Sequence, residues 1–337
     1  EIKALLAHPE ISRDLDFEAL DQYLTFEYVP APKSIFRDIR KVLPGEYLRV
    51  DSRGGIHSER YWEIDYTREM PDKPEQEQAE ALGDLLRRAV RRQLVADVPL
   101  GAFLSGGIDS SAICALAAEA VPKVKTFHIG FEEKSFDESE YAAEVARHLG
   151  TDHHVKRFSA GDMLDLVPSV MDYLDEPFGD ASFLPCLLLS RFTREHVKVS
   201  LSGDGGDELF AGYPTYIAHC VAPYYRYVPR LVRHGVASVI ERLPASDDNL
   251  TLEFQLKKMM SGLEEKSPAR RNYAWLGSFL PGEKRELLSE ETNALLDKAD
   301  ALEVAESYFE SCRAADPLEK LLHCDRRFYL QDDMLVK

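Results

Sequence analysis

The chain has 337 residues, of which 45% are hydrophobic and 30% are charged, and its formal net charge at pH 7 is −18. This length favours two domains, or one large domain with an appendage. The negative charge disfavours nucleic acid and anionic membranes as partners, and neither a signal peptide nor a membrane-spanning run is visible. Five scattered cysteines without a C-x-x-C pair favour reduced thiols over a disulfide frame or a zinc site.

The N-terminal residues 1–66 mix short helical and strand-like stretches. Helical spacing predicts a helix over 16–26. Two short strands, 46–50 and 60–64, are expected on either side of a Gly54-Gly55 turn. This pattern is too sparse for a complete domain.

A linker and a larger domain are expected next. Residues 67–77 are polar and contain two prolines, as a domain boundary does, so residues 78–337 are predicted to form a second domain. The chain begins without Met and stops within an apolar pattern at 335–337. We therefore expect a piece of a longer protein, truncated at both ends.

Helices and strands alternate from residue 79 to residue 201. Helices are expected at 79–94, 110–120, 139–149 and 163–174, and strands at 98–104, 124–131, 154–158 and 197–201. Such alternation predicts an α/β fold, a parallel sheet with helices on both faces. From Pro214 onward the pattern is mainly helical, so we expect a helical C-terminal part.

The first chemical motif is a glycine turn between an expected strand and an expected helix. Gly106 and Gly107 allow the backbone to approach a ligand, and the helix start favours phosphate. Ser105 and Ser110 add hydroxyl donors. Because Asp109 would repel phosphates, this phosphate-binding loop requires a hard cation such as Mg²⁺. A turn merely capped by Asp and Ser is the structural alternative.

The second motif, Ser202-Gly203-Asp204-Gly205-Gly206-Asp207-Glu208, follows the expected strand 197–201. Loops at the carboxyl ends of parallel strands form the ligand crevice of an open sheet, so this turn is expected to face the first one. Asp109 and Asp207 would then hold one Mg²⁺, with Asp204 turned toward the reacting group. A calcium-like surface loop is the alternative.

An acidic turn, Asp175-Glu176-Pro177-Phe178-Gly179-Asp180-Ala181-Ser182, lies between two expected helices. One interpretation is a proline and glycine turn that carries solvated charges. The other is an edge of the ligand crevice that holds an amine. The sequence favours neither.

The two glycine motifs together resemble the ATP-pyrophosphatase loops of glutamine-dependent asparagine synthetases. Further similar strings lie at 97–101, 126–131, 136–139, 150–154 and 175–178. The resemblance therefore covers nearly the whole chain. It implies an adenine nucleotide alpha hydrolase-like fold, in which residues 1–66 are the tail of an N-terminal glutaminase domain and its connector.

The resemblance also implies a reaction and its cofactors, ATP and Mg²⁺. ATP would activate the β-carboxylate of aspartate as an adenylate with release of pyrophosphate, and ammonia, normally from glutamine, would then give asparagine and AMP. The implied nucleotide contacts are Leu104, Ile129, Ser202 and Gly203, the implied metal ligands are Asp109 and Asp207, and Asp204 would help to form the adenylate. A cytoplasmic location is expected, and a homodimer is an option.

Two departures from the family pattern limit this expectation. The glutaminase of the family uses an N-terminal Cys, whereas residue 1 is Glu and the first cysteine is Cys114. A later lysine and an Arg-containing segment of the relatives would follow Lys337. We therefore expect that this fragment does not hydrolyse glutamine and that it lacks full synthetase activity, even where it binds ATP.

Three alternative functions stay open. A related amidotransferase or a β-lactam synthetase-like enzyme would adenylate another carboxylate, since only the acceptor pocket differs. A tRNA-modifying enzyme, such as a tRNA thiolase, has a similar loop, but the acidic charge and the lack of a paired reactive Cys oppose it. A non-catalytic regulator that binds nucleotide is the third.

Overall fold

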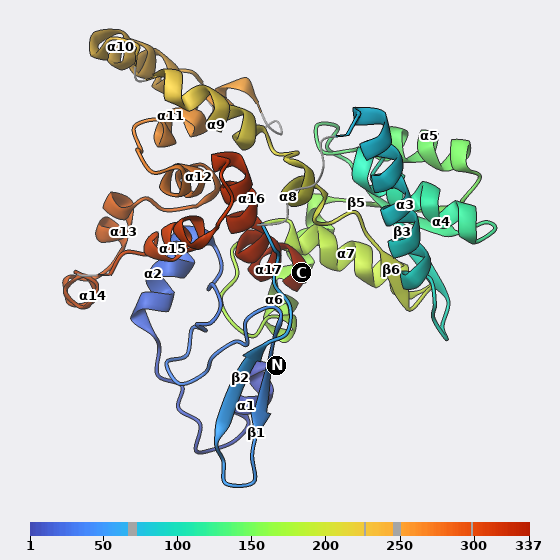
Figure 1. The fold of residues 1–337 in the computed structure, drawn as a ribbon, viewed down its shortest axis with the longest axis horizontal. Helices are drawn as coiled ribbons and strands as arrows, with labels where there is room; N and C mark the ends of the chain where they lie inside the picture. The colour runs from blue at the N-terminus through green and yellow to red at the C-terminus, as the bar shows by residue number, and fades with distance from the viewer. Residues whose placement is uncertain (67–72, 226, 245–250, 298) are drawn as a thin grey trace. The chain divides into compact units, whose positions relative to one another are not determined.

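A computed structural model describes residues 1–66, 73–225, 227–244, 251–297 and 299–337. They belong to two compact units (Figure 1). Unit 1 comprises Glu1–Arg68, Met171–Asp180 and Asp207–Val336, and unit 2 comprises Glu69–Val170, Ala181–Gly206 and Lys337. The expected linear division into 1–66, 67–77 and 78–337 stays a prediction. Part of the expected linker, 67–72, lies outside the described residues.

Unit 2 is built on a four-stranded parallel sheet with the strand order β5-β4-β3-β6. Its strands are β3 (Leu100–Phe103), β4 (Lys125–Phe131), β5 (Asp152–Phe158) and β6 (Val199–Leu201). Gly101 of β3 pairs with Lys125 of β4, and Ala102 pairs with Leu201 of β6. The carboxyl ends of β3 and β6 therefore lie side by side, where ligands of open α/β sheets bind.

Helices cover both faces of this sheet. They are α3 (Glu75–Gln93), α4 (Ile108–Ala120), α5 (Ser139–Leu149), α6 (Ala160–Tyr173) and α7 (Phe183–Arg194). Because side chains alternate along a strand, each face has its own apolar cluster. One cluster contains Ala102, Leu104, Cys114, Ala142 and Ala146, and the other contains Phe127, Ile129, Leu166, Leu188 and Phe192. The expected α/β fold with a doubly covered parallel sheet is confirmed.

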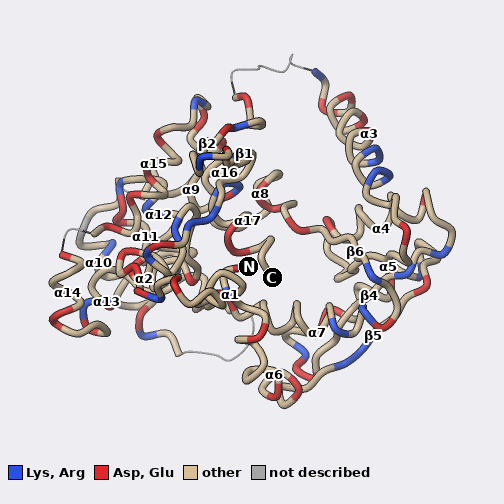
Figure 2. Tube along the Cα trace, turned by 90° about the horizontal axis from the view of Figure 1, so that it is seen from below, with Lys and Arg blue, Asp and Glu red and all other residues tan. Residues whose placement is uncertain are grey.

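Helix α3 is long but buries only Val90. Its first turn carries Glu75 and Glu77, and its last turn carries Arg91 and Arg92. Figure 2 shows this change from acidic to basic residues along the helix. The arrangement opposes the helix dipole and stabilises a helix that has little apolar contact.

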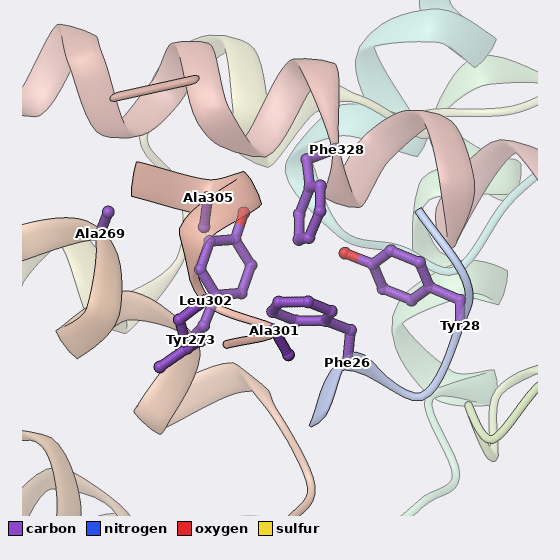
Figure 3. Packing of buried hydrophobic residues seen from close by; sticks show 8 residues of the cluster. All are labelled: Phe26, Tyr28, Ala269, Tyr273, Ala301, Leu302, Ala305 and Phe328. Carbon is purple, nitrogen blue, oxygen red and sulfur yellow. The ribbon is translucent and has the colours of Figure 1, made fainter. Parts of the chain in front are cut away.

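Unit 1 is mainly helical, as expected for the chain after Pro214. Its helices are α1 (Ile2–Leu6), α2 (Phe17–Phe26), α8 (Gly206–Phe210), α9 (Pro214–Tyr225), α10 (Arg230–Glu241), α11 (Leu252–Gly262), α12 (Pro268–Leu276), α13 (Pro281–Leu287), α14 (Glu290–Leu295), α15 (Glu303–Ser311), α16 (Pro317–Arg327), α17 (Tyr329–Asp332) and a 3₁₀ turn at Met334–Val336. The Phe26 ring packs edge-on against Phe328 at 4.7 Å and against Tyr273 at 5.3 Å between ring centroids (Figure 3). Segments far apart in sequence thus share one core.

The N-terminal hairpin differs from the expectation in one strand. Its strands are β1 (Glu46–Val50) and β2 (Ile56–Arg60), so the second strand begins four residues earlier than the predicted 60–64. The reason is the tightness of the turn. The Asp51 carboxylate accepts hydrogen bonds from the N–H groups of Arg53 and Gly55 at 2.8 and 2.9 Å, which closes the turn before Ile56.

Candidate active site

The first glycine loop joins β3 to α4 and is held by its own hydroxyl groups. The N–H of Ser105 donates to Ser110 Oγ at 3.2 Å, and the two Oγ atoms lie 3.0 Å apart. The Gly107 N–H donates to Ser105 Oγ at 3.2 Å. Gly106 has φ = +90°, and a Cβ there would lie 2.6 Å from Tyr141 Cβ. This position therefore requires glycine.

Helix α4 begins at Ile108, two residues before the predicted start at Ser110. Gly107 is its N-cap residue and has extended backbone angles, so the helix starts directly after the glycine turn. Asp109 thus lies in the first turn of the helix, where the helix dipole favours negative charge. The Ile108 side chain is 88% exposed, and the loop is open to solvent at this point.

The second glycine turn packs directly against the start of α4. A Cβ on Gly203 would lie 2.7 Å from the backbone nitrogen of Ser110, and a Cβ on Gly206 would lie 2.4 Å from Asp109 Cγ. Gly205 has φ = +90°. The structure thus brings the first loop together with the turn up to Gly206, all within unit 2.

The surroundings of Asp109 fit a hard cation. Its carboxylate lies in a cradle that a Cβ on Gly206 would fill. No group of three or more His, Cys, Asp and Glu that could hold a metal was found among the described residues, and Mg²⁺ is usually held by one or two carboxylates together with phosphate. Asp207 belongs to unit 1, so its pairing with Asp109 on one ion stays a prediction.

The other predicted site residues differ in exposure. The side chains of Leu104 and Ile129 are buried, 1% and 7% exposed, so their main-chain groups are what a nucleotide would contact. The Leu104 N–H already donates to the Phe127 carbonyl at 2.9 Å. Ser202 is half-buried just after β6, and Asp204 is exposed at the tip of the turn. Their roles stay predictions.

A buried polar network in unit 1 continues from the second motif and was not expected from the sequence. Glu208 is fully buried, and its Oε1 accepts a hydrogen bond from the Tyr213 hydroxyl at 2.6 Å. Asp325 of α16 is also fully buried and accepts hydrogen bonds from Tyr216 at 2.7 Å and Asn272 at 2.8 Å. Burial raises the pKa of the Asp325 carboxyl to about 6.

Only part of this network leaves a signal in the sequence. Tyr213 and Tyr216 closely follow the second motif, and a tyrosine hydroxyl usually needs a partner when it is buried. Asp325 lies 109 residues beyond Tyr216, and nothing in its own neighbourhood points to that partner. Sequence patterns therefore could not predict this network.

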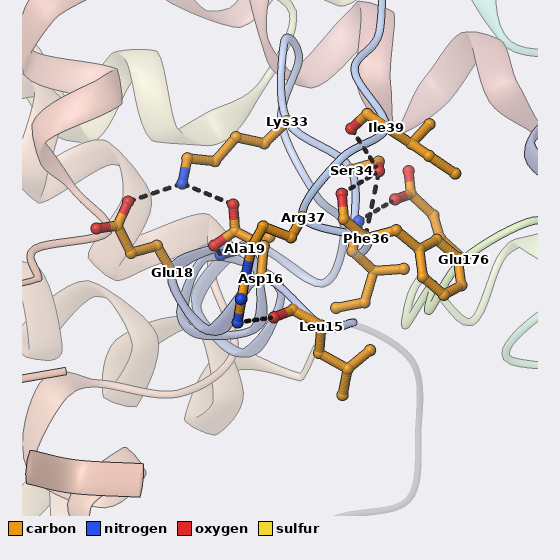
Figure 4. Close-up of polar contacts among 11 residues, drawn as sticks. Leu15, Asp16, Glu18, Ala19, Lys33, Ser34, Phe36, Arg37, Ile39 and Glu176 are labelled. Atoms are coloured by element: carbon orange, nitrogen blue, oxygen red, sulfur yellow. Dashed lines mark hydrogen bonds and ion pairs between the residues drawn. The ribbon is translucent and has the colours of Figure 1, made fainter. Parts of the chain in front are cut away.

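Two carboxylates of the acidic turn after α6 have specific partners, so the turn is not freely solvated. Glu176 Oε2 accepts a hydrogen bond from the Ile35 N–H at 2.9 Å (Figure 4), and its Oε1 lies 2.5 Å from Lys41 Nζ. Asp175 Oδ2 accepts one from the Ile2 N–H at 2.6 Å. Both carboxylates thus bind residues of the N-terminal segment.

Two family models match the chain. The model described as asparagine synthase matches residues 81–337, and the model described as glutamine amidotransferase domain matches residues 1–62. The chain belongs to the asparagine synthase family. We call residues 1–62 the amidotransferase-matched segment and residues 81–337 the synthase-matched segment.

Curated relatives agree with this assignment. A putative glutamine-hydrolyzing asparagine synthetase of Mycobacterium tuberculosis H37Rv is 32% identical over 326 residues, which are 96% of this chain and 48% of the relative. Asparagine synthetase 1 of Bacillus subtilis 168 is 29% identical over 331 residues, 96% of this chain and 49% of the relative. The chain spans about half the length of the curated relatives it matches.

A solved structure that matches part of the chain is the NH3-dependent NAD synthetase of Campylobacter jejuni. It is 15% identical and covers 69% of this chain and 96% of its own, with a TM-score of 0.29. At that score the similarity adds nothing to the family assignment. Within the described residues, every helix is too short or too polar to span a bilayer.

Proposed function

We propose that the protein containing this chain converts aspartate to asparagine with ATP. An oxygen of the aspartate β-carboxylate attacks the α-phosphorus of ATP, and pyrophosphate leaves. Ammonia then attacks the carbonyl carbon of the β-aspartyl adenylate, and AMP leaves. The close packing of Gly203 and Gly206 on the start of α4 carries this proposal, because it brings the two glycine turns together at one edge of the sheet.

The roles proposed for individual residues follow from their chemistry. Ser105, Gly106, Gly107 and Ser110 would hold the phosphates through N–H and O–H donors, and preorganised donors of this kind stabilise the leaving pyrophosphate. Asp109 and Asp207 would hold Mg²⁺. When bound, the ion would neutralise negative charge on the phosphate oxygens. Asp204 would face the reacting carboxylate, and Leu104, Ile129, Ser202 and Gly203 would contact the rest of the nucleotide.

The ammonia would come from glutamine, but not through Cys114. The first cysteine in the chain is Cys114, which is fully buried. Burial raises the pKa of its thiol to about 12, and the reactive thiolate is therefore disfavoured. A cytoplasmic location and a homodimer remain part of the same proposal.

The test is to find which acid makes the full-length protein release pyrophosphate from ATP. Aspartate with ammonium ions should support release, and Asp204→Asn should abolish it while ATP still binds. Another carboxylic acid in place of aspartate would indicate a related amidotransferase or a β-lactam synthetase-like enzyme. Release that requires tRNA would refute the proposal.

A further inference from the structure

The chain leaves unit 2 once between α6 and α7 and returns after ten residues. These residues, Met171–Asp180, belong to unit 1, whereas the residues on both sides belong to unit 2. We call them the connecting segment. They lie within the synthase-matched segment 81–337.

The connecting segment is bound by the amidotransferase-matched segment along its length. Lys3 Nζ donates to the Asp172 carbonyl at 2.9 Å, and the Gly179 N–H donates to the Glu27 carbonyl at 2.7 Å. Between these ends, Glu176 accepts a hydrogen bond from Ile35 and forms the ion pair with Lys41. The Glu176 side chain is only 15% exposed, so solvent screens this ion pair little.

Apolar packing holds this joint at Phe178, whose side chain packs against the cluster that contains Phe26 and Tyr28. A cavity of about 570 Å³ adjoins it, and its lining includes Val29, Lys41, Glu176 and Asp332. Around Glu176, polar contacts hold the connecting segment beside this open space. Loss of the Lys41–Glu176 pair would let the part of the segment around Glu176 shift into this cavity, while Phe178 stays packed.

Both ends of the connecting segment lead into the apolar cluster behind the candidate nucleotide site. Leu166 of α6 and Leu188 of α7 pack in the same cluster as Ile129 of β4, one of the proposed nucleotide contacts. A shift of the connecting segment would thus be passed along the chain to the helices that support Ile129. The coupling needs no direct contact between Glu176 and a substrate.

We propose that Glu176 is a positioning residue that couples glutamine-dependent ammonia supply to the ATP-dependent reaction, through its contacts with Lys41 and Ile35. This inference rests on the proposed function and adds the residue that links the two matched segments. Glu176→Gln keeps the shape of the side chain but removes the charge. Lys41→Met removes the other half of the pair.

The experiment compares two ammonia sources in the full-length protein. Pyrophosphate release is measured with saturating aspartate and ATP, once with glutamine and once with ammonium chloride. Either variant should lower the ratio of the glutamine-supported to the ammonium-supported rate about tenfold, within the usual range of coupling between sites. The double variant should fall no further than either single variant, because both remove the same interaction.

Lys33→Met is the matched control. Lys33 pairs with Asp16 at 3.0 Å and Glu18 at 2.7 Å, and its side chain is 26% exposed, as is that of Lys41. Both of its partners lie inside the amidotransferase-matched segment (Figure 4). Its loss should leave the ratio unchanged, and an equal fall would show that any ion pair in this segment has the same effect, which would overturn the assignment.

The outcomes separate this inference from the proposed function. An unchanged ratio in Glu176→Gln, with wild-type protein active on both ammonia sources, would overturn the coupling role alone. Equal loss of both rates would identify Glu176 as a residue needed for the fold or the synthetase reaction, and would overturn it too. If the wild-type protein released pyrophosphate with ammonium but not with glutamine, the inference would be overturned. If it released none with either ammonia source, the proposed function would be refuted.

Discussion

The two units hold their polar groups in different ways. In unit 2, the candidate phosphate loop is built from glycine backbone and two serine hydroxyls within a few residues of one another. In unit 1, buried polar groups include Asp325, which accepts from Tyr216 109 residues away, and Lys284, which pairs with Asp21 263 residues away. A site that must admit a ligand keeps its donors near solvent, whereas a helical core needs its buried charges paired. We therefore expect variants of these buried unit 1 residues to lose stability and loop variants to lose ATP binding.

Removing Lys284 should have the largest effect on stability. The Lys284 ammonium is 8% exposed, forms an ion pair with Asp21 between α13 and α2, and donates to Thr25 Oγ1 at 2.8 Å. Lys284→Met would leave a buried carboxylate unpaired and cost about 4 kcal/mol of unfolding free energy. The measurement is denaturant unfolding followed by tryptophan fluorescence, since both tryptophans, Trp62 and Trp275, lie in unit 1.

The control for this variant is Arg60→Met in the hairpin. Arg60 pairs with Glu46 at 2.9 Å, and its side chain is 38% exposed. An exposed pair of this kind contributes less than about 1 kcal/mol. Equal losses of unfolding free energy in the two variants would contradict the importance of burial. A loss of ATP affinity in Lys284→Met would contradict the expectation that this residue affects stability alone.

The pH dependence of stability should report on Asp325. Burial raises its pKa to about 6, above the usual value near 3.9, so between these pH values the folded protein keeps a proton that the unfolded chain has released. The free energy of unfolding should therefore fall by about 3 kcal/mol as the pH rises from about 4 to about 6, and this contribution should be constant above.

Asp325→Asn should remove that slope, because Asn has no titrating carboxyl. The contribution of Asp325 is the difference in the free energy of unfolding between the parent and the variant, measured by urea unfolding at a series of pH values. Parallel curves for the two proteins would show that Asp325 does not titrate with folding. Tyr216→Phe removes one donor to the Asp325 carboxylate. It should raise the pKa of Asp325, so the fall in unfolding free energy should extend to a higher pH.

The two units also differ in how much of their structure could be predicted from the sequence. The sheet of unit 2 follows from apolar runs between glycine turns, and Ser105, Asp109 and Gly203 could be placed because the turns lie next to strands that are neighbours in the sheet. The start of α4 shifted by two residues, since Gly107 already ends the turn. Local patterns therefore predicted the sheet of this unit, but they gave no range for α7.

Unit 1 depends on pairs that no local pattern contains. Asp21 with Lys284, Glu176 with Lys41 and Tyr216 with Asp325 join residues 263, 135 and 109 positions apart, and each side chain alone is typical of a solvated helix or turn. The hydrophobic spacing predicted helices but not which helices meet. A single sequence therefore predicts the candidate site more fully than the structure that supports it.

In unit 2, Gly206→Ala should weaken ATP binding. The added Cβ would lie 2.4 Å from Asp109 Cγ, so the Asp109 carboxylate would be displaced, and loss of one charged contact to the ligand, about 2 kcal/mol, corresponds to about thirtyfold in the dissociation constant of ATP. Titration calorimetry with Mg²⁺ and ATP measures it. Gly83→Ala is the control, because no atom lies within 4 Å of a Cβ there, and wild-type affinity in Gly206→Ala would contradict the close approach of the two turns.

The smallest effect is expected from Ser110→Ala. Its hydroxyl bonds to the N–H and the Oγ of Ser105, and loss of about 1 kcal/mol of hydrogen bonding should weaken ATP binding about fivefold without lowering stability in unit 1. Ser169→Ala loses a hydroxyl bond of 2.9 Å to the Leu166 carbonyl, away from the loop, and should leave ATP binding unchanged. If both variants bind ATP equally well, the hydroxyl groups only stabilise local structure and the loop holds phosphate through its backbone alone.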